Sequence, residues 1–141
     1  MINNAILFPM FALVAWTGIV LALIPIARFG AARNGQVVAD DFKFGESASV
    51  PQAVSIPNRN YMNLLELPML FYVVCALLYV SNAYSSTAVD VAWAYVTARV
   101  LHSGIHLTYN KVMHRLVLFT ISNGLLIALW VMAGLRLLSP G

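Results

Sequence analysis

The sequence predicts an all-α integral membrane protein in which residues 1–141 form one domain, a four-helix bundle with four transmembrane helices. The first observation behind this fold class is composition. The chain of 141 residues is 61% hydrophobic and only 9% charged, with a mean hydropathy of +0.82, whereas a soluble domain carries about 25% charged residues. The second is that the apolar residues gather in four segments, each long enough to cross about 30 Å of hydrocarbon.

The first apolar segment, Ala5–Ala27, contains no charged side chain. It is longer than the apolar part of a signal peptide and no basic residue precedes it, so we interpret it as a retained span. The other predicted spans are Tyr61–Val80, Val91–Tyr109 and Leu116–Leu138. Short, turn-forming connections separate the second, third and fourth spans, which predicts that these helices are antiparallel neighbours.

The connection between the first two spans, residues 28–60, is much longer. It contains turn-forming, acidic and proline elements, among them Asn34-Gly35, Asp40-Asp41 and Pro51. Connections of this length are usually functional or disordered. A lid that contacts a ligand and a simple tether both agree with this composition.

The net charge is +3, and the placement of the cations orients the chain. Basic residues gather in the first and third connections, as Arg28, Arg33, Lys43, Arg59, Lys111 and Arg115. The positive-inside bias therefore predicts that these two connections are cytoplasmic and that both termini lie on the other side, with Arg136 as the one exception. Because the cations are scattered over span ends, they indicate no nucleic-acid partner.

Two polar stripes interrupt the apolar segments. Their members recur at i, i+4, i+7 and at i, i+3, i+7, so each set lies on one helical face: Arg59, Asn63 and Glu66, then Arg99, His102 and His106. Ionisable groups at membrane depth cost free energy and usually mark a functional site. The alternative is a buried ion pair that only joins helices.

The hairpin brings the two stripes to similar depths. At about 1.5 Å per residue, Glu66 and His102 lie level and Arg99 about one turn deeper, which predicts a Glu66–Arg99 ion pair. The other stripe residues, together with Arg115, would form a net-positive pocket open to the cytoplasm. Such a pocket suits a small anionic or zwitterionic ligand and favours ionisation of a thiol.

A metal site is the competing interpretation of the same residues. His102 and His106 have the i, i+4 spacing of a ligand pair, and Glu66 offers a third ligand. The neighbouring Arg99 and Arg115 oppose a divalent cation, and no H-E-x-x-H pattern is present. We therefore predict no metal.

Small residues provide two further helix faces, Gly18 with Ala22 and Gly124 with Ala128. Such faces allow close helix packing in membranes. The sequence leaves open whether that packing lies within the bundle or between subunits.

These motifs also resemble a known family. Arg59-x-x-x-Asn63-x-x-Glu66, followed by Leu67-Pro68, is similar to the signature of the membrane-associated proteins in eicosanoid and glutathione metabolism. The segment 98–102, His106 and Arg115 resemble the third and fourth helices of that family. The chain is similar to a bacterial-type member over nearly its whole length.

The resemblance implies a homotrimer in the bacterial inner membrane that binds glutathione, as cosubstrate, between neighbouring subunits. The reaction implied is attack of the glutathione thiolate on a lipophilic electrophile or hydroperoxide that enters from the lipid bilayer. Arg115 would be the catalytic residue that stabilises the thiolate. The implied glutathione-binding residues are Arg28, Arg59, Asn63, Glu66, Arg99, His102 and His106.

Three positions depart from the eicosanoid-type pattern. His106 stands where a tyrosine is common, and Leu116 and Phe119 replace a serine and a tyrosine. A broad-specificity transferase or peroxidase is therefore expected before an eicosanoid synthase. Two other classes stay open: a binding or structural protein with this scaffold and no transferase activity, and a proton or solute pathway through the buried glutamate and histidines.

Overall fold

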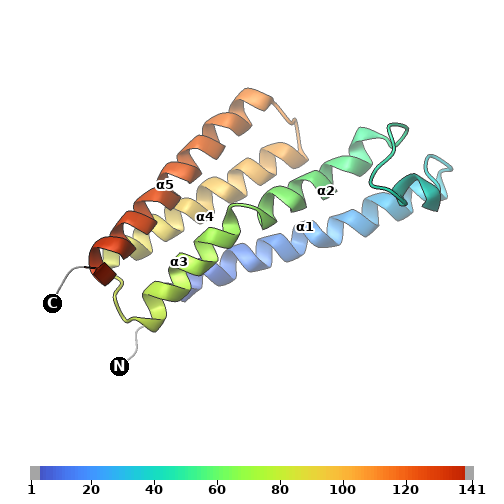
Figure 1. Cartoon of the computed structure of the whole chain (residues 1–141). Coiled ribbons are helices and arrows are strands. Elements are labelled where there is room, and N and C mark those ends of the chain that lie inside the picture. The colour runs from blue at the N-terminus through green and yellow to red at the C-terminus, as the bar shows by residue number, and fades with distance from the viewer. Residues whose placement is uncertain (1–3, 139–141) are drawn as a thin grey trace.

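The computed structural model describes residues 4–138 of the chain. Within this range the long helices run back and forth along one bundle (Figure 1), which confirms the predicted all-α class. The elements are α1 (Leu7–Arg33), the short 3-10 helix η1 (Ala39–Phe42), α2 (Gln52–Leu65), α3 (Pro68–Val80), α4 (Ser86–Leu107) and α5 (Val112–Leu138). We call the end of the bundle with residues 34–51 and the α4–α5 turn the loop end, and the opposite end the far end.

The predicted second span consists of two helices. α2 ends at Leu65 and α3 begins at Pro68, and Glu66 has φ −75° and ψ −96°. Proline lacks an N–H and its ring clashes with the carbonyl four residues earlier, here that of Leu64. The helix therefore stops before Pro68, which takes the first position of α3, where proline is favoured.

The connection between the first two predicted spans is largely ordered. α1 continues past Ala27 to Arg33, and α2 already begins at Gln52. Between them, Phe42 packs against a small separate core formed by Ala31, Val37, Val50 and Val54. Residues 34–51 are therefore held by their own apolar contacts.

Three stretches are long and apolar enough to cross a membrane, judged by length and composition: Leu7–Arg33, Gln52–Val80 and Val112–Leu138. The predicted span Val91–Tyr109 lies on α4, which is not among them. α4 carries Asp90 and the polar residues of the second stripe, and it buries Arg99, His102 and His106 inside the bundle. Its low apolar content follows from this central position, and its role as a span stays a prediction.

The main core fills the space between the helices with apolar side chains, including Leu13, Phe71, Leu78, Tyr95 and Leu129. The two small-residue faces point away from it. A Cβ atom added to Gly18 or to Gly124 would meet no atom within 4 Å. These glycines therefore do not serve helix packing inside this chain.

Candidate functional site

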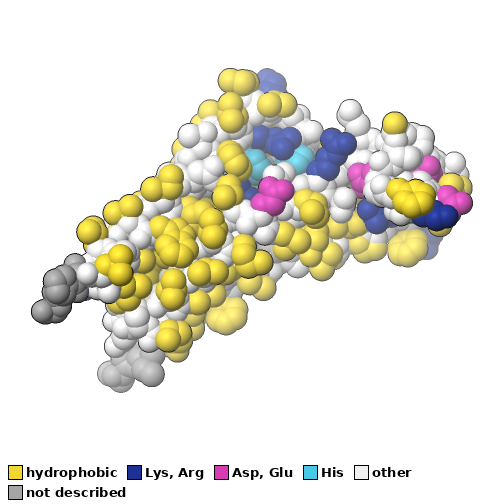
Figure 2. Space-filling view, viewed as in Figure 1, with side chains coloured by type: hydrophobic (Ala, Val, Ile, Leu, Met, Phe, Trp, Pro, Cys, Tyr) yellow, Lys and Arg dark blue, Asp and Glu magenta, His cyan; other side chains and the backbone are white. Residues whose placement is uncertain are grey.

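A cavity of about 750 Å³ lies at the loop end, between the start of α2 and the α4–α5 turn. Figure 2 shows basic, acidic and histidine side chains gathered around a hollow, on a face that is otherwise largely apolar. Five of the predicted site residues line this cavity: Arg59, Asn63, Glu66, His106 and Arg115. Four of them belong to the two stripes, the whole first stripe and His106 of the second, and the fifth is Arg115.

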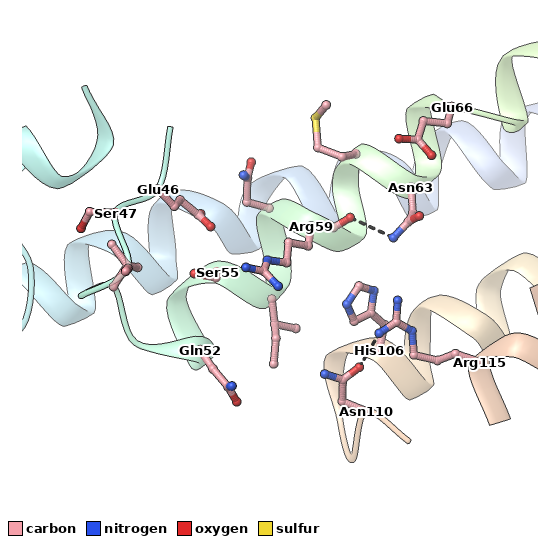
Figure 3. A pocket seen from close by; sticks show the side chains of 15 residues that line it. Glu46, Ser47, Gln52, Ser55, Arg59, Asn63, Glu66, His106, Asn110 and Arg115 are labelled. Atoms are coloured by element: carbon pink, nitrogen blue, oxygen red, sulfur yellow. Dashed lines mark hydrogen bonds between the residues drawn. The ribbon is translucent and has the colours of Figure 1, made fainter. Parts of the chain in front are cut away.

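The first wall is α2, where helical periodicity places Arg59 and Asn63 toward the hollow (Figure 3). Glu66, which directly follows the helix, lines the hollow as well. The side chain of Asn63 donates to the backbone carbonyl of Arg59 at 3.1 Å. The Arg59 guanidinium has no hydrogen-bond or ion-pair partner among residues 4–138. It is an exposed cation available to a ligand.

The second wall is the α4–α5 turn. Asn110 adopts φ 50° there, a left-handed conformation that asparagine tolerates better than most residues. Its Oδ1 accepts a hydrogen bond from Arg115 Nη1 at 2.8 Å, which orients the guanidinium beside His106 (Figure 3). His106 is only 3% exposed, and its Nδ1 has no hydrogen-bond partner within the described chain. The turn thus presents an oriented cation next to an imidazole.

The predicted Glu66–Arg99 ion pair is wrong. Arg99 is 1% exposed and its Nη2 instead donates to the backbone carbonyl of Asn63. The prediction assumed an unbroken helix through Glu66, whereas α2 ends one residue before it. No backbone N–H bonds the Asn63 carbonyl at this break, so the Arg99 guanidinium supplies the missing donor. Non-helical backbone at membrane depth requires such a partner.

Arg99 and His102 therefore lie beneath the main cavity and do not line it. His102 contributes to a smaller neighbouring cavity of about 250 Å³, which it shares with Asn63, Arg115 and Phe119. The Phe119 ring centroid is 6.1 Å from that of His102 and 6.0 Å from the Arg99 guanidinium carbon. Arg99 supports the α2 wall from behind through its bond to Asn63, whereas His102 lies beside Phe119 in the smaller cavity.

Arg28 also lies outside the cavity lining. Its Nη2 lies 3.4 Å from Glu46 Oε1, in the one ion pair found among residues 4–138. The Arg28 guanidinium also stacks over the Phe42 ring at 4.3 Å. Both partners come from the loop, so Arg28 reaches the site only through Glu46.

Sequence reasoning missed the third wall, which the loop and the start of α2 supply. Its polar members are Glu46, Ser47, Gln52, Ser55 and Asn58. The length and acidic content of residues 28–60 were the available signal, and they supported the lid interpretation without naming a residue. Glu46 changes the electrostatics of the cavity, because Arg59 and Arg115 now face Glu46 and Glu66. The cavity carries balanced formal charge when His106 is neutral, and the predicted net-positive pocket is corrected accordingly.

This charge pattern fits a zwitterionic ligand better than a simple anion or a metal ion. Arginine forks bind carboxylates, and carboxylates accept from ammonium groups. Within residues 4–138 no group of three His, Cys, Asp or Glu side chains is placed to hold a metal ion.

Comparison with known proteins gives one result. The model of the MAPEG family, the membrane-associated proteins in eicosanoid and glutathione metabolism, matches residues 6–135, nearly the whole chain. Neither the curated proteins nor the solved structures give a match.

Proposed function

The chain belongs to the MAPEG family, and from this premise we propose that it is a membrane-bound, glutathione-dependent transferase or peroxidase. The family includes enzymes of both kinds. One observation carries the proposal: Arg115, oriented by Asn110, and the unpartnered Arg59 face one cavity at the end of an apolar bundle. This arrangement provides cations for both the carboxylates and the sulfur of glutathione.

In the proposed complex the tripeptide lies along α2. Arg59 and Asn63 bind its carboxylate and amide groups, and Glu66 accepts from an N–H. Arg99 keeps this wall in place from below, since it holds the Asn63 carbonyl at the helix break. His102 lies in the adjoining smaller cavity with Asn63 and Arg115. His106 packs against the tripeptide beside Arg115.

Arg115 would act on the thiol. A guanidinium close to sulfur stabilises the thiolate relative to the thiol, so a larger fraction is ionised at neutral pH. The proton leaves to solvent through the open cavity. In the transferase reaction the sulfur forms a bond to an electrophilic carbon as the leaving group departs. In the peroxidase reaction two glutathione molecules are oxidised to the disulfide while a hydroperoxide becomes an alcohol and water.

The assembly and topology belong to the same proposal. We propose a homotrimer in which α4 is the fourth membrane-spanning helix, with the loop end facing the cytoplasm of a bacterial inner membrane. The outward-facing Gly18 and Gly124 support contacts between subunits, because neither glycine packs within its own chain. The lipophilic substrate would reach the thiolate from the bilayer.

Stopped-flow measurement of thiolate absorbance after mixing with glutathione tests the chemistry. The wild-type protein should form thiolate at neutral pH. In Arg115→Ala the amount of thiolate formed should fall about tenfold or more, as expected when a charge-assisted contact is removed. Lys111→Ala is the matched control, because Lys111 is an exposed cation of the same turn and does not line the cavity.

Two outcomes would contradict the proposal in different ways. Glutathione binding without thiolate formation would assign the chain to the second candidate, a binding protein without transferase activity. The apolar Leu116 and Phe119 beside Arg115 favour that candidate, since they donate no hydrogen bond to the sulfur. No binding of glutathione at millimolar concentration would overturn both the transferase or peroxidase and the glutathione-binding protein, and would favour a structural protein with this scaffold.

A further inference from the structure

We propose that the far end of the bundle carries a lipid-binding site, in which Arg136 binds the phosphate group of a phospholipid from the adjoining leaflet. Arg136 is the one basic residue whose place opposes the positive-inside pattern of the others. A phosphate ligand gives this cation a role. The site lies at the opposite end of the molecule from the glutathione cavity and does not depend on the proposed function.

The α3–α4 turn and the last turns of α5 lie at the same end of the bundle (Figure 1), and a cavity of about 380 Å³ lies between them. Its polar lining residues are Ser85, Thr87 and Arg136, and none of the described residues that line it is acidic. Its apolar lining includes Leu78 of α3 and Met132 of α5. The cavity therefore offers one cation and two hydroxyl groups next to a hydrocarbon wall.

The donors of this cavity are unused within the chain. Arg136 is exposed and has no hydrogen-bond or ion-pair partner among residues 4–138. Ser85 Oγ accepts from the N–H of Ala88 at 3.2 Å, which fixes this hydroxyl at the start of α4. Neither Ser85 nor Thr87 donates its hydroxyl proton to a group of the described chain. Guanidinium and hydroxyl groups with free protons bind phosphate oxygens, and arginine can do so through two parallel bonds.

The depth of Arg136 favours a membrane lipid over a soluble phosphate. α5 is long and apolar enough to cross a membrane, and it has no charged side chain between Arg115 and Arg136. At about 1.5 Å per residue these two arginines are about 32 Å apart along the helix, close to the hydrocarbon thickness of about 30 Å. With the uncharged stretch in the hydrocarbon, Arg136 lies level with the lipid phosphates, and the acyl chains can follow the apolar wall of the cavity.

Native mass spectrometry of the full chain, released from non-ionic detergent micelles, measures the affinity for single bound ligands. Three ligands separate the phosphate from the acyl chains: phosphatidylglycerol, diacylglycerol with the same chains, and glycerophosphoglycerol, which has no chains. Wild-type protein should bind phosphatidylglycerol about tenfold or more tightly than diacylglycerol, because the charge-assisted bonds to the phosphate are lost with the latter. It should bind glycerophosphoglycerol more weakly than phosphatidylglycerol, because the apolar contacts are lost.

Arg136→Gln should lower the affinity for phosphatidylglycerol to about that for diacylglycerol, whose own affinity should change little. Arg136→Lys retains the charge and should keep part of the preference, and Thr87→Val removes one hydroxyl and should reduce it less than Arg136→Gln does. Arg33→Gln is the matched control, because Arg33 is an exposed cation at the loop end of α1 and does not line this cavity. Partial unfolding lowers both lipid affinities alike, so it cancels in the ratio measured on one variant.

Three results would overturn the proposal. If Arg136→Gln keeps a tenfold preference, or if Arg33→Gln loses it, the phosphate is not bound by Arg136. Equal affinity of the wild-type protein for phosphatidylglycerol and diacylglycerol would mean that Arg136 is only solvated. If glycerophosphoglycerol binds as tightly as phosphatidylglycerol, the ligand is a soluble phosphate ester and the assignment to a lipid is wrong.

Discussion

The two halves of the bundle bury different kinds of side chain. Toward the far end the buried residues are apolar, and the Phe71 and Tyr95 rings stack with centroids 4.5 Å apart. Toward the loop end the buried set is rich in polar groups. They include Ser55, Asn60, Arg99, His102, Ser103 and His106, and the other buried polar residue given for the described chain is Ser122 on α5. The helix break before Pro68, between α2 and α3 in Figure 1, lies beside the polar set, since Arg99 bonds the Asn63 carbonyl there.

The apolar far half therefore contributes mainly to stability, whereas the polar loop half contributes mainly to the binding site. Burial of apolar surface stabilises the fold, whereas a buried polar group costs free energy unless it is hydrogen-bonded. In the loop half, Asn60 and Trp16 both donate to Ser103, and Arg99 donates to Asn63. These bonds offset a cost that an apolar interior would avoid, which supports a binding role for the cavity above them.

The largest effect on stability is expected in the far half. Phe71 is fully buried, so Phe71→Ala should lower the free energy of unfolding by about 3–5 kcal/mol through lost contacts and a cavity. Ligand affinity per folded molecule should change little, since Phe71 does not line the cavity. Reversible unfolding in detergent micelles and titration with glutathione measure the two quantities.

The matched control is Met69→Ala, because Met69 lies on the same helix and is exposed. Its unfolding free energy should stay close to that of the wild-type protein. A Phe71→Ala protein with wild-type stability, or one that is folded yet unable to bind the ligand, would remove the division between the two halves.

A smaller loss of unfolding free energy, accompanied by a loss of ligand affinity, is expected for Ser103→Ala in the loop half. Ser103 Oγ accepts from Trp16 Nε1 at 2.8 Å and from Asn60 Nδ2 at 2.7 Å. The alanine removes the acceptor of Trp16 and leaves Asn60 only its longer bond to the carbonyl of residue 103, at 3.5 Å, and should cost about 1–3 kcal/mol. Glutathione affinity should fall as well, because Asn60 directly follows Arg59 on α2.

Thr97→Ala is the control for this substitution. Thr97 lies on the same helix, is exposed, and donates only to the carbonyl of Trp93 in its own helix, at 2.9 Å. It should change stability by no more than about 0.5 kcal/mol. If both variants behave alike, the hydrogen bonds of Ser103 do not hold the loop half together.

Local patterns in the sequence predict the parts of the site that depend on helical periodicity. Residues 59 and 63 share a face because α2 is helical there, and the short α4–α5 turn brings His106 next to Arg115. Glu66 lines the same cavity although it lies just past the end of α2. The partner of Arg99 differs from the prediction because Pro68 ends the helix and leaves the Asn63 carbonyl without a backbone donor, a consequence that side-chain spacing does not reveal. Glu46 could not be placed, since its position depends on the non-local contacts of Arg28 and Phe42.

The smallest effect is expected in the loop itself, and it depends on pH. Asp41 accepts from the Val38 N–H at 2.9 Å and from the hydroxyls of Ser47 and Ser49. The bond from Val38, and after it the bond from Ser47, hold the pKa of this carboxyl below its ordinary value of 3.8. Because the pKa is lower in the folded state, the stabilisation that the Asp41 carboxylate gives the loop is complete above the pKa of the unfolded state. It is lost as the pH falls through the pKa of the folded state.

The order of residues 34–51 should therefore be constant from neutral pH down to about 4 and decline below it, with no cooperative unfolding of the bundle. Hydrogen exchange of peptides from this segment, corrected for the intrinsic pH dependence of exchange, measures the change. Asp41→Asn should exchange faster at neutral pH and lose the dependence on acid. If protection of the loop in wild-type protein and in Asp41→Asn follows the same pH profile, the Asp41 hydrogen bonds do not order the wall that carries Glu46.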